Sequence, residues 1–215
     1  MKKLLITAAL TLFSVMSFAQ TAYEKAMTEK IGQAEKMLSA DEFTALANDF
    51  VRIGNKEKTQ WLPYYYAALT TIQKGRTLMQ AGKTNELDPI ADEAQKYLDQ
   101  SVELNKENAE NYILQKMIHS LKMMVNPMER FQTEGTLAAQ ALAKATALDK
   151  DNPRITLLNA EDTYFTPEQF GGSKEKGLEL FKKALEQYGQ YKPASSMSPN
   201  WGKAEALYFL GQAKQ

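Results

Sequence analysis

Leu142-Ala143-Lys144-Ala145 and Phe181-Lys182-Lys183-Ala184-Leu185 stand near the two ends of the stretch that decides the fold, residues 142–188. Each of these two segments contains part of one pattern, in which a small, a large and a small residue are spaced four and then three positions apart. Such residues fall on one face of an α-helix, where the large side chain fills a gap and the small ones let a neighbouring helix approach. The pattern occurs at Ala94, Leu98 and Ser101, at Ala138, Leu142 and Ala145, and at Gly177, Phe181 and Ala184. We therefore expect three copies of one packed helix.

This arrangement resembles the second helix of the tetratricopeptide (TPR) repeat, a helical hairpin of 34 residues that stacks into a solenoid. The steps between Ser101, Ala145 and Ala184 are longer than that repeat. The extra residues fall in two stretches rich in turn formers, 124–135 and 166–172. The resemblance implies a solenoid whose concave face is lined by the first helix of each hairpin.

Helical signals along the rest of the chain predict an all-α fold, a TPR-like solenoid of about four hairpins with a C-terminal capping helix. No segment alternates polar and apolar residues as a half-buried strand does. We expect a single domain over residues 20–215, in which the capping helix covers the apolar face that the last hairpin leaves open. The predicted hairpins cover residues 22–53, 61–104, 109–148 and 153–188, and the predicted capping helix covers residues 199–213.

Cap and turn residues indicate where the helices begin and end. Ser39-Ala40-Asp41-Glu42 has the form of a capping box, and Gly54 supplies the left-handed residue that ends many helices. Several pairs of a capping residue and a proline indicate further helix starts, because proline lacks only an amide that is unpaired there anyway. These pairs are Asp88-Pro89, Asn126-Pro127, Asn152-Pro153, Thr166-Pro167 and Ser198-Pro199.

The N-terminus has the features of a secretory signal peptide over residues 1–19. Two lysines precede an apolar run, residues 4–15, and Ser17-Phe18-Ala19 places small residues where a signal peptidase requires them. The apolar run is shorter than the ~20 residues that span a bilayer, so no membrane insertion is expected after cleavage. We expect an exported protein, most simply a periplasmic one, with an extracellular location as the alternative.

Charge and cysteine content exclude several classes of protein. The formal net charge is zero, and loss of Lys2 and Lys3 with the signal peptide would make it −2, so no attraction to nucleic acid follows. The chain contains no cysteine, which excludes disulfides, a thiol nucleophile and thiolate-bound zinc.

Candidate catalytic and metal-binding residues are few, and each has a simpler structural interpretation. His119 is the single histidine and has no evident partner in the sequence, so a structural role is favoured. The segment 149–152 lacks the glycine and late glutamate of a calcium loop and is interpreted as a turn. Gly171 and Gly172 precede Ser173 without a phosphate-loop spacing, so they favour a connection capped by the serine. We therefore predict no enzyme, no catalytic residue, no metal site and no cofactor.

The aromatic group Trp61, Tyr64, Tyr65 and Tyr66 is the most suggestive feature for binding. Four bulky rings so close together cannot all point one way on a helix, so one should face solvent or a groove. In one interpretation Trp61 and Tyr65 pack between helices while the other two rings cover the first hairpin, and in the other Tyr66 lies on the concave face. The positions that the TPR resemblance places in the groove are Tyr66, Glu110, Met117, Arg154, Glu161, Tyr164 and Gln212.

These observations favour a non-catalytic scaffold of the cell envelope that binds an unknown protein or peptide in the concave groove. Aromatic, methionine and arginine side chains there would suit such a partner. The alternative is a binder of a small ligand or polymer, acting as an accessory to an envelope uptake or assembly system.

Overall fold

The computed structural model describes residues 22–36 and 38–212, and all of their regular structure is helical. The all-α fold that the sequence predicts is confirmed. The predicted signal peptide lies outside the described residues. The long helices are residues 22–34, α2 (Ala40–Glu57), α3 (Leu62–Gln80), α4 (Leu87–Leu104), α5 (Ala109–Val125), α7 (Thr136–Leu148), α8 (Pro153–Phe165), α9 (Lys174–Gln190) and α10 (Lys203–Gln212).

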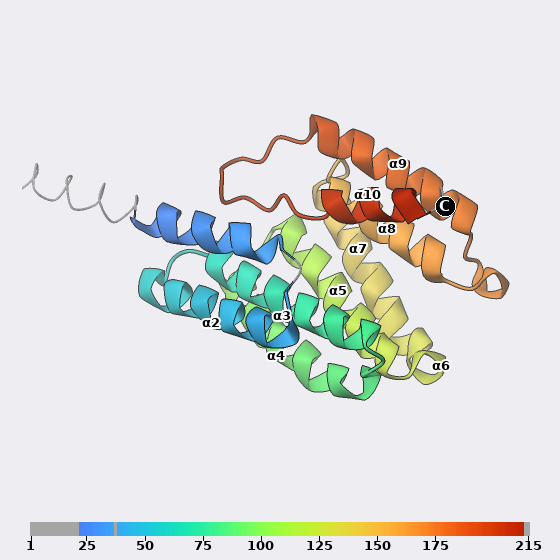
Figure 1. Cartoon of the computed structure of the whole chain (residues 1–215), viewed down its shortest axis with the longest axis horizontal. Helices are drawn as coiled ribbons and strands as arrows, with labels where there is room; N and C mark the ends of the chain where they lie inside the picture. Colours follow the sequence, from blue (N-terminus) through green and yellow to red (C-terminus); the bar gives the residue numbers. More distant parts are fainter. Residues whose placement is uncertain (1–21, 37, 213–215) are drawn as a thin grey trace, which may run out of the picture.

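Helices that follow one another in the chain pack side by side, from α2 to α5 and again from α8 to α10 (Figure 1). Between α5 and α7 lie the short helix α6 (Pro127–Arg130) and one π-helical turn (Phe131–Gly135). Short 3-10 turns precede α4 (Thr84–Glu86) and α9 (Glu168–Phe170). None of the described helices is both long enough and apolar enough to cross a bilayer.

The hydrophobic core has two parts. The larger one joins the N-terminal helix, α2, α3, α4, α5 and the facing sides of α7 and α8. The smaller one lies between α8, α9 and α10. The residues of the small, large, small pattern are buried in both parts, with Leu98 and Phe181 completely enclosed, so this pattern identified the packed faces correctly.

The helix end predicted at Gly54 is wrong by one turn, because this glycine serves close packing between helices. Ser39 and Glu42 form the predicted capping box. Gly54, however, lies inside α2, which continues to Glu57 and ends at the left-handed Lys58. A Cβ atom on Gly54 would lie 2.7 Å from the ring of Tyr64, so the glycine is needed for the close approach of α3.

Some of the residues predicted to cap helices do so in the structure, and others do not. Asn152 and Ser173 accept hydrogen bonds from the first turns of α8 and α9, as predicted. Asp88 already lies inside α4, where its carboxylate accepts two hydrogen bonds from Arg130 instead of capping the helix. Ser198 caps no helix, because α10 begins only at Lys203 and the residues before it form an extended connection.

Candidate functional site

The connection between α9 and α10, residues 191–202, passes in front of α3 and is called the strap below. It leaves the end of α9, reaches the N-terminal helix and returns to α10 (Figure 1). Five of its twelve residues are exposed, whereas Met197 and Pro199 are buried, and Met197 belongs to the same core cluster as residues of α3 and the N-terminal helix. The strap therefore covers Tyr66, which the sequence predicted to lie in an open groove.

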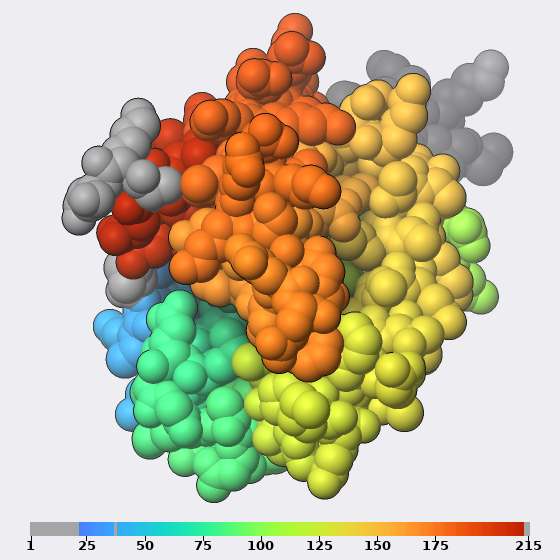
Figure 2. Space-filling view, turned by 90° about the vertical axis from the view of Figure 1, so that its right-hand side faces the viewer, coloured from blue at the N-terminus to red at the C-terminus, as the bar shows by residue number. Residues whose placement is uncertain are grey.

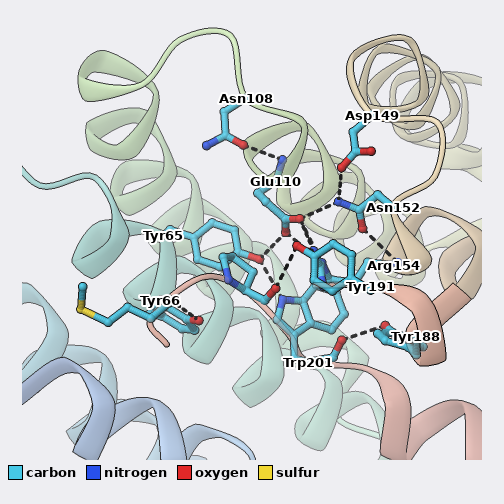
Figure 3. A network of polar contacts seen from close by, with 12 residues as sticks. Tyr65, Tyr66, Asn108, Glu110, Asp149, Asn152, Arg154, Tyr188, Tyr191 and Trp201 are labelled. Carbon is cyan, nitrogen blue, oxygen red and sulfur yellow. Dashed lines mark hydrogen bonds and ion pairs between the residues drawn. The ribbon is translucent and has the colours of Figure 1, made fainter. Parts of the chain in front are cut away.

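Arg154 is the centre of a buried polar network beneath the strap (Figure 3). Its side chain is fully enclosed, and its Nε donates to both carboxylate oxygens of Glu110 at 3.0 Å. Its Nη2 donates to the Tyr191 hydroxyl at 2.9 Å, and the guanidinium lies over the Tyr191 ring at 4.8 Å. Burial disfavours the charged guanidinium, but the Glu110 carboxylate outweighs it and raises the pKa of Arg154 above its ordinary value. The network joins α5, α8 and the start of the strap.

Three tyrosines fasten the other parts of the strap. Tyr65 donates to Glu110 at 2.9 Å and accepts from the indole Nε1 of Trp201 at 2.8 Å. Tyr188 donates to the backbone oxygen of Trp201 at 2.7 Å. The middle of the strap is held by a single side-chain hydrogen bond to α3, from the Tyr66 hydroxyl to the backbone oxygen of Met197 at 3.0 Å.

A second group of charges connects α3 with the C-terminal helices. Arg76 forms ion pairs with Glu161, at 3.3 Å, and with Glu205. Burial raises the pKa of Glu161 to about 7; Arg76 partly opposes this rise, and Glu205 adds to it. Lys116 of α5 donates to Asp162 at 2.7 Å, so a separate ion pair joins α5 to α8.

A cavity of about 190 Å³ lies between the strap, α3 and the N-terminal helix, and we call it the strap pocket. Ile31, Ala34 and Leu69 give it apolar walls, and the rings of Tyr66 and Trp201 also line it. Polar groups from the strap, α3 and the end of the N-terminal helix complete the lining. These are Glu35, Thr70, Gln73, Ser195, Ser196, Ser198 and Asn200, beside Pro193.

The structure distributes the predicted groove residues over several different environments, and their role in binding stays a prediction. Tyr66 lines the strap pocket, while Glu110 and Arg154 form the network beneath the strap. Met117 is buried in the core, and Glu161 belongs to the Arg76 cluster.

Two of the predicted groove residues lie away from the pocket. Tyr164 packs against Phe181 and Phe209 in the smaller core, and Gln212 is exposed at the end of α10. The residues that the sequence analysis missed are Met197 and Trp201 of the strap. Two apolar side chains within a polar loop were the available signal for them.

His119 has the structural role that the sequence favoured. Its Nδ1 lies 2.7 Å from the Glu134 carboxylate, and its Nε2 lies 3.1 Å from the amide nitrogen of Gln115. The imidazole thus ties the π-helical turn to α5. Within residues 22–36 and 38–212, no cluster of three histidine, aspartate or glutamate side chains could hold a metal ion.

Comparison with known proteins gives one informative relationship. No protein-family model and no curated protein matches the chain. A solved structure, the HusA haemophore from Porphyromonas gingivalis, is similar to it with a TM-score of 0.77 and 32% sequence identity, over 90% of this chain and 94% of that one. The chain belongs to the family of the HusA haemophore.

Proposed function

We propose that this protein binds haem or a closely related tetrapyrrole as its cargo, in a site on the concave side beneath the strap. The observation that carries the proposal is the 32% identity to a haemophore over almost its whole length. It favours the small-ligand alternative from the sequence over a peptide-binding groove. The concave side, where a peptide was expected, is filled by the chain's own strap.

The lining of the strap pocket supports a flat, largely apolar ligand. Tyr66 and Trp201 offer aromatic surfaces, and Ile31, Ala34 and Leu69 offer aliphatic ones. Pockets for organic ligands combine such walls with a few polar groups, and aromatic rings stack favourably on one another. Glu35 is the only charged residue of the lining, so carboxylate groups of a cargo would point out of the pocket.

The inventory of possible iron ligands indicates that the ring, rather than its metal, would supply most of the binding energy. The chain has no cysteine, and both ring nitrogens of its one histidine already have partners. Burial, and then the nearby Glu110 carboxylate, raise the pKa of the Tyr66 phenol, which disfavours the phenolate form that would bind iron. We therefore expect iron-free protoporphyrin to bind about as tightly as haem.

The test is a titration of the purified protein with haem and with protoporphyrin, followed by absorbance and fluorescence. Ala34→Arg puts a long charged side chain into the pocket and should weaken binding of both ligands at least 10-fold. Gly32→Arg is the matched control, because it adds the same side chain to the same helix where nothing lies within 4 Å of its Cβ. Equal binding by both variants, or no binding by the unaltered protein, would overturn the proposal.

A further inference from the structure

The strap pocket is too small for the proposed cargo as it stands. Its volume is about 190 Å³. Pockets that hold drug-sized ligands have volumes of about 300–1,000 Å³, and a tetrapyrrole is a large member of that class. At least one of the three walls must therefore move when the cargo enters.

Two of the walls belong to the packed core. Residues 62–72 of α3 are all buried, so α3 cannot shift without disturbing its neighbours on every side. The N-terminal helix is fixed by Tyr23 and Met27, which are buried in the larger core. Packed interiors of this kind resist displacement.

The third wall, the strap, is built differently. Its two ends are fastened by side chains, Tyr191 to Arg154 and Trp201 to Tyr65 and Tyr188. Between them, most of residues 192–200 are exposed and form no helix. Across the pocket, α3 holds them by one side-chain hydrogen bond, from Tyr66 to the Met197 carbonyl, and by the buried Met197 side chain.

We infer that residues 192–200 form a lid that swings between its two fastened ends, and that the cargo displaces the buried Met197 side chain and stacks on the ring of Tyr66 in the pocket. Met197 suits a replaceable plug, because the unbranched methionine side chain adapts readily to new surroundings. Stacking of the cargo on the Tyr66 ring would compensate for the packing that the methionine side chain gives up. The lid rests on the proposed function for its cargo, but its movement is measurable without any cargo.

Lid movement is tested first by thiol labelling, which the absence of native cysteines makes clean. Met197→Cys places a buried thiol on the lid itself. Ser101→Cys places a thiol on α4, at a position where the native side chain is fully buried in the core. We expect the thiol at position 197 to react with a maleimide at least 100-fold faster than the thiol at position 101. Adding Tyr66→Phe should speed the reaction at position 197 a further 2- to 10-fold, the value of one hydrogen bond. Equal rates at the two positions would overturn the lid.

The role of the lid in binding is tested by cross-linking the lid to α3. Gln73→Cys and Ser196→Cys place thiols on α3 and on the strap, both in the lining of the same small pocket. Linking the two thiols with a short bismaleimide should weaken protoporphyrin binding at least 10-fold. The same protein with a monofunctional maleimide on each thiol should keep its affinity for protoporphyrin. If the locked protein binds as tightly as the unlocked one, the lid is wrong. If no form binds a tetrapyrrole, the proposed function fails, and the labelling rates still decide whether the lid opens.

Discussion

The block from α2 to α5 and the C-terminal part, α8 to α10 with the strap, are held in place by different forces. The first block shares a continuous apolar core that reaches from the N-terminal helix to one side of α7 and α8. The C-terminal part has a small core of its own, touches the larger core through Ile155, Leu158 and Met197, and is also joined to the block by buried polar contacts centred on Arg154 and Arg76. Figure 2 shows the turn between α8 and α9 standing out from the end of the molecule. Apolar packing thus builds the scaffold, and polar contacts set the position of the part that covers the concave side.

The largest effect should come from the buried polar contact between the two regions. Arg154→Ala leaves the Glu110 carboxylate buried without its cation, and breaking such a pair typically lowers the free energy of unfolding by ~3–5 kcal/mol. Urea unfolding followed by circular dichroism measures the change. Lys122→Ala is the control, because its ion pair with Asp92 is solvent-exposed and should contribute at most ~1 kcal/mol. Equal losses in the two variants would show that the Arg154 network does not hold the C-terminal part.

Close packing in the first block should give the next largest effect. Gly54→Ala drives a methyl group into the Tyr64 ring and should lower the free energy of unfolding by ~1–3 kcal/mol. Gly189→Ala makes the same change in α9, where nothing lies within 4 Å, and should instead stabilise the protein by up to ~1 kcal/mol through helix propensity. Thermal melts of both variants would show opposite shifts, and shifts of the same sign would contradict this account of the packing.

The Arg76 cluster, which joins the two regions, predicts that the free energy of unfolding depends on pH. Because the pKa of Glu161 is raised to about 7 in the folded protein, its ionisation costs folding energy. The contribution of Glu161 to the free energy of unfolding should therefore be more favourable below about pH 4.5 than above pH 7. This contribution should fall as the pH rises between these two values.

Glu161→Gln should remove roughly 1–3 kcal/mol of this pH dependence, because the amide cannot ionise. Glu186→Gln, at an exposed position of α9, should leave the pH profile unchanged. Unfolding by urea at a series of pH values from 4.5 to 8 measures both. A profile that is the same for the native protein and for Glu161→Gln would show that Glu161 titrates normally.

The smallest effect concerns the helix caps, which occur in both regions. Ser39 and Ser173 accept hydrogen bonds from the first turns of α2 and α9, and replacing either by alanine should cost ~1 kcal/mol. The Ser39 change should cost slightly more, because the Ser39 hydroxyl also donates a hydrogen bond to the Glu42 carboxylate, which alanine cannot do. Melting temperatures of the two variants would order them, and a larger loss at Ser173 would contradict the ranking.

The scaffold was largely predictable from the sequence, because its signals are local. The spacing around Leu98, Leu142 and Phe181 identified packed helix faces, and Asn152 identified a helix start. Gly54 was misread because its role comes from the approach of another helix, which local turn chemistry does not reveal.

The candidate site was only partly predictable. The TPR resemblance placed Tyr66, Glu110 and Arg154 in one groove; in the structure Tyr66 lines the strap pocket, while Glu110 and Arg154 form the buried network beneath the strap. It could not show that the strap covers them, because Met197 and Tyr66 meet across 131 positions of the chain. Such docking depends on tertiary geometry and leaves no periodic pattern in the sequence.

Nuclear magnetic resonance of the methionine methyl groups, recorded while iron-free protoporphyrin is added, tests the central claim most directly. The ring current of a bound porphyrin shifts nearby methyl signals. Met197 is the buried methionine of the strap, whereas Met128 of α6 is 81% exposed. The account predicts that the Met197 signal moves on binding and the Met128 signal does not. A shift of Met128 with Met197 unchanged would place the cargo elsewhere and contradict it.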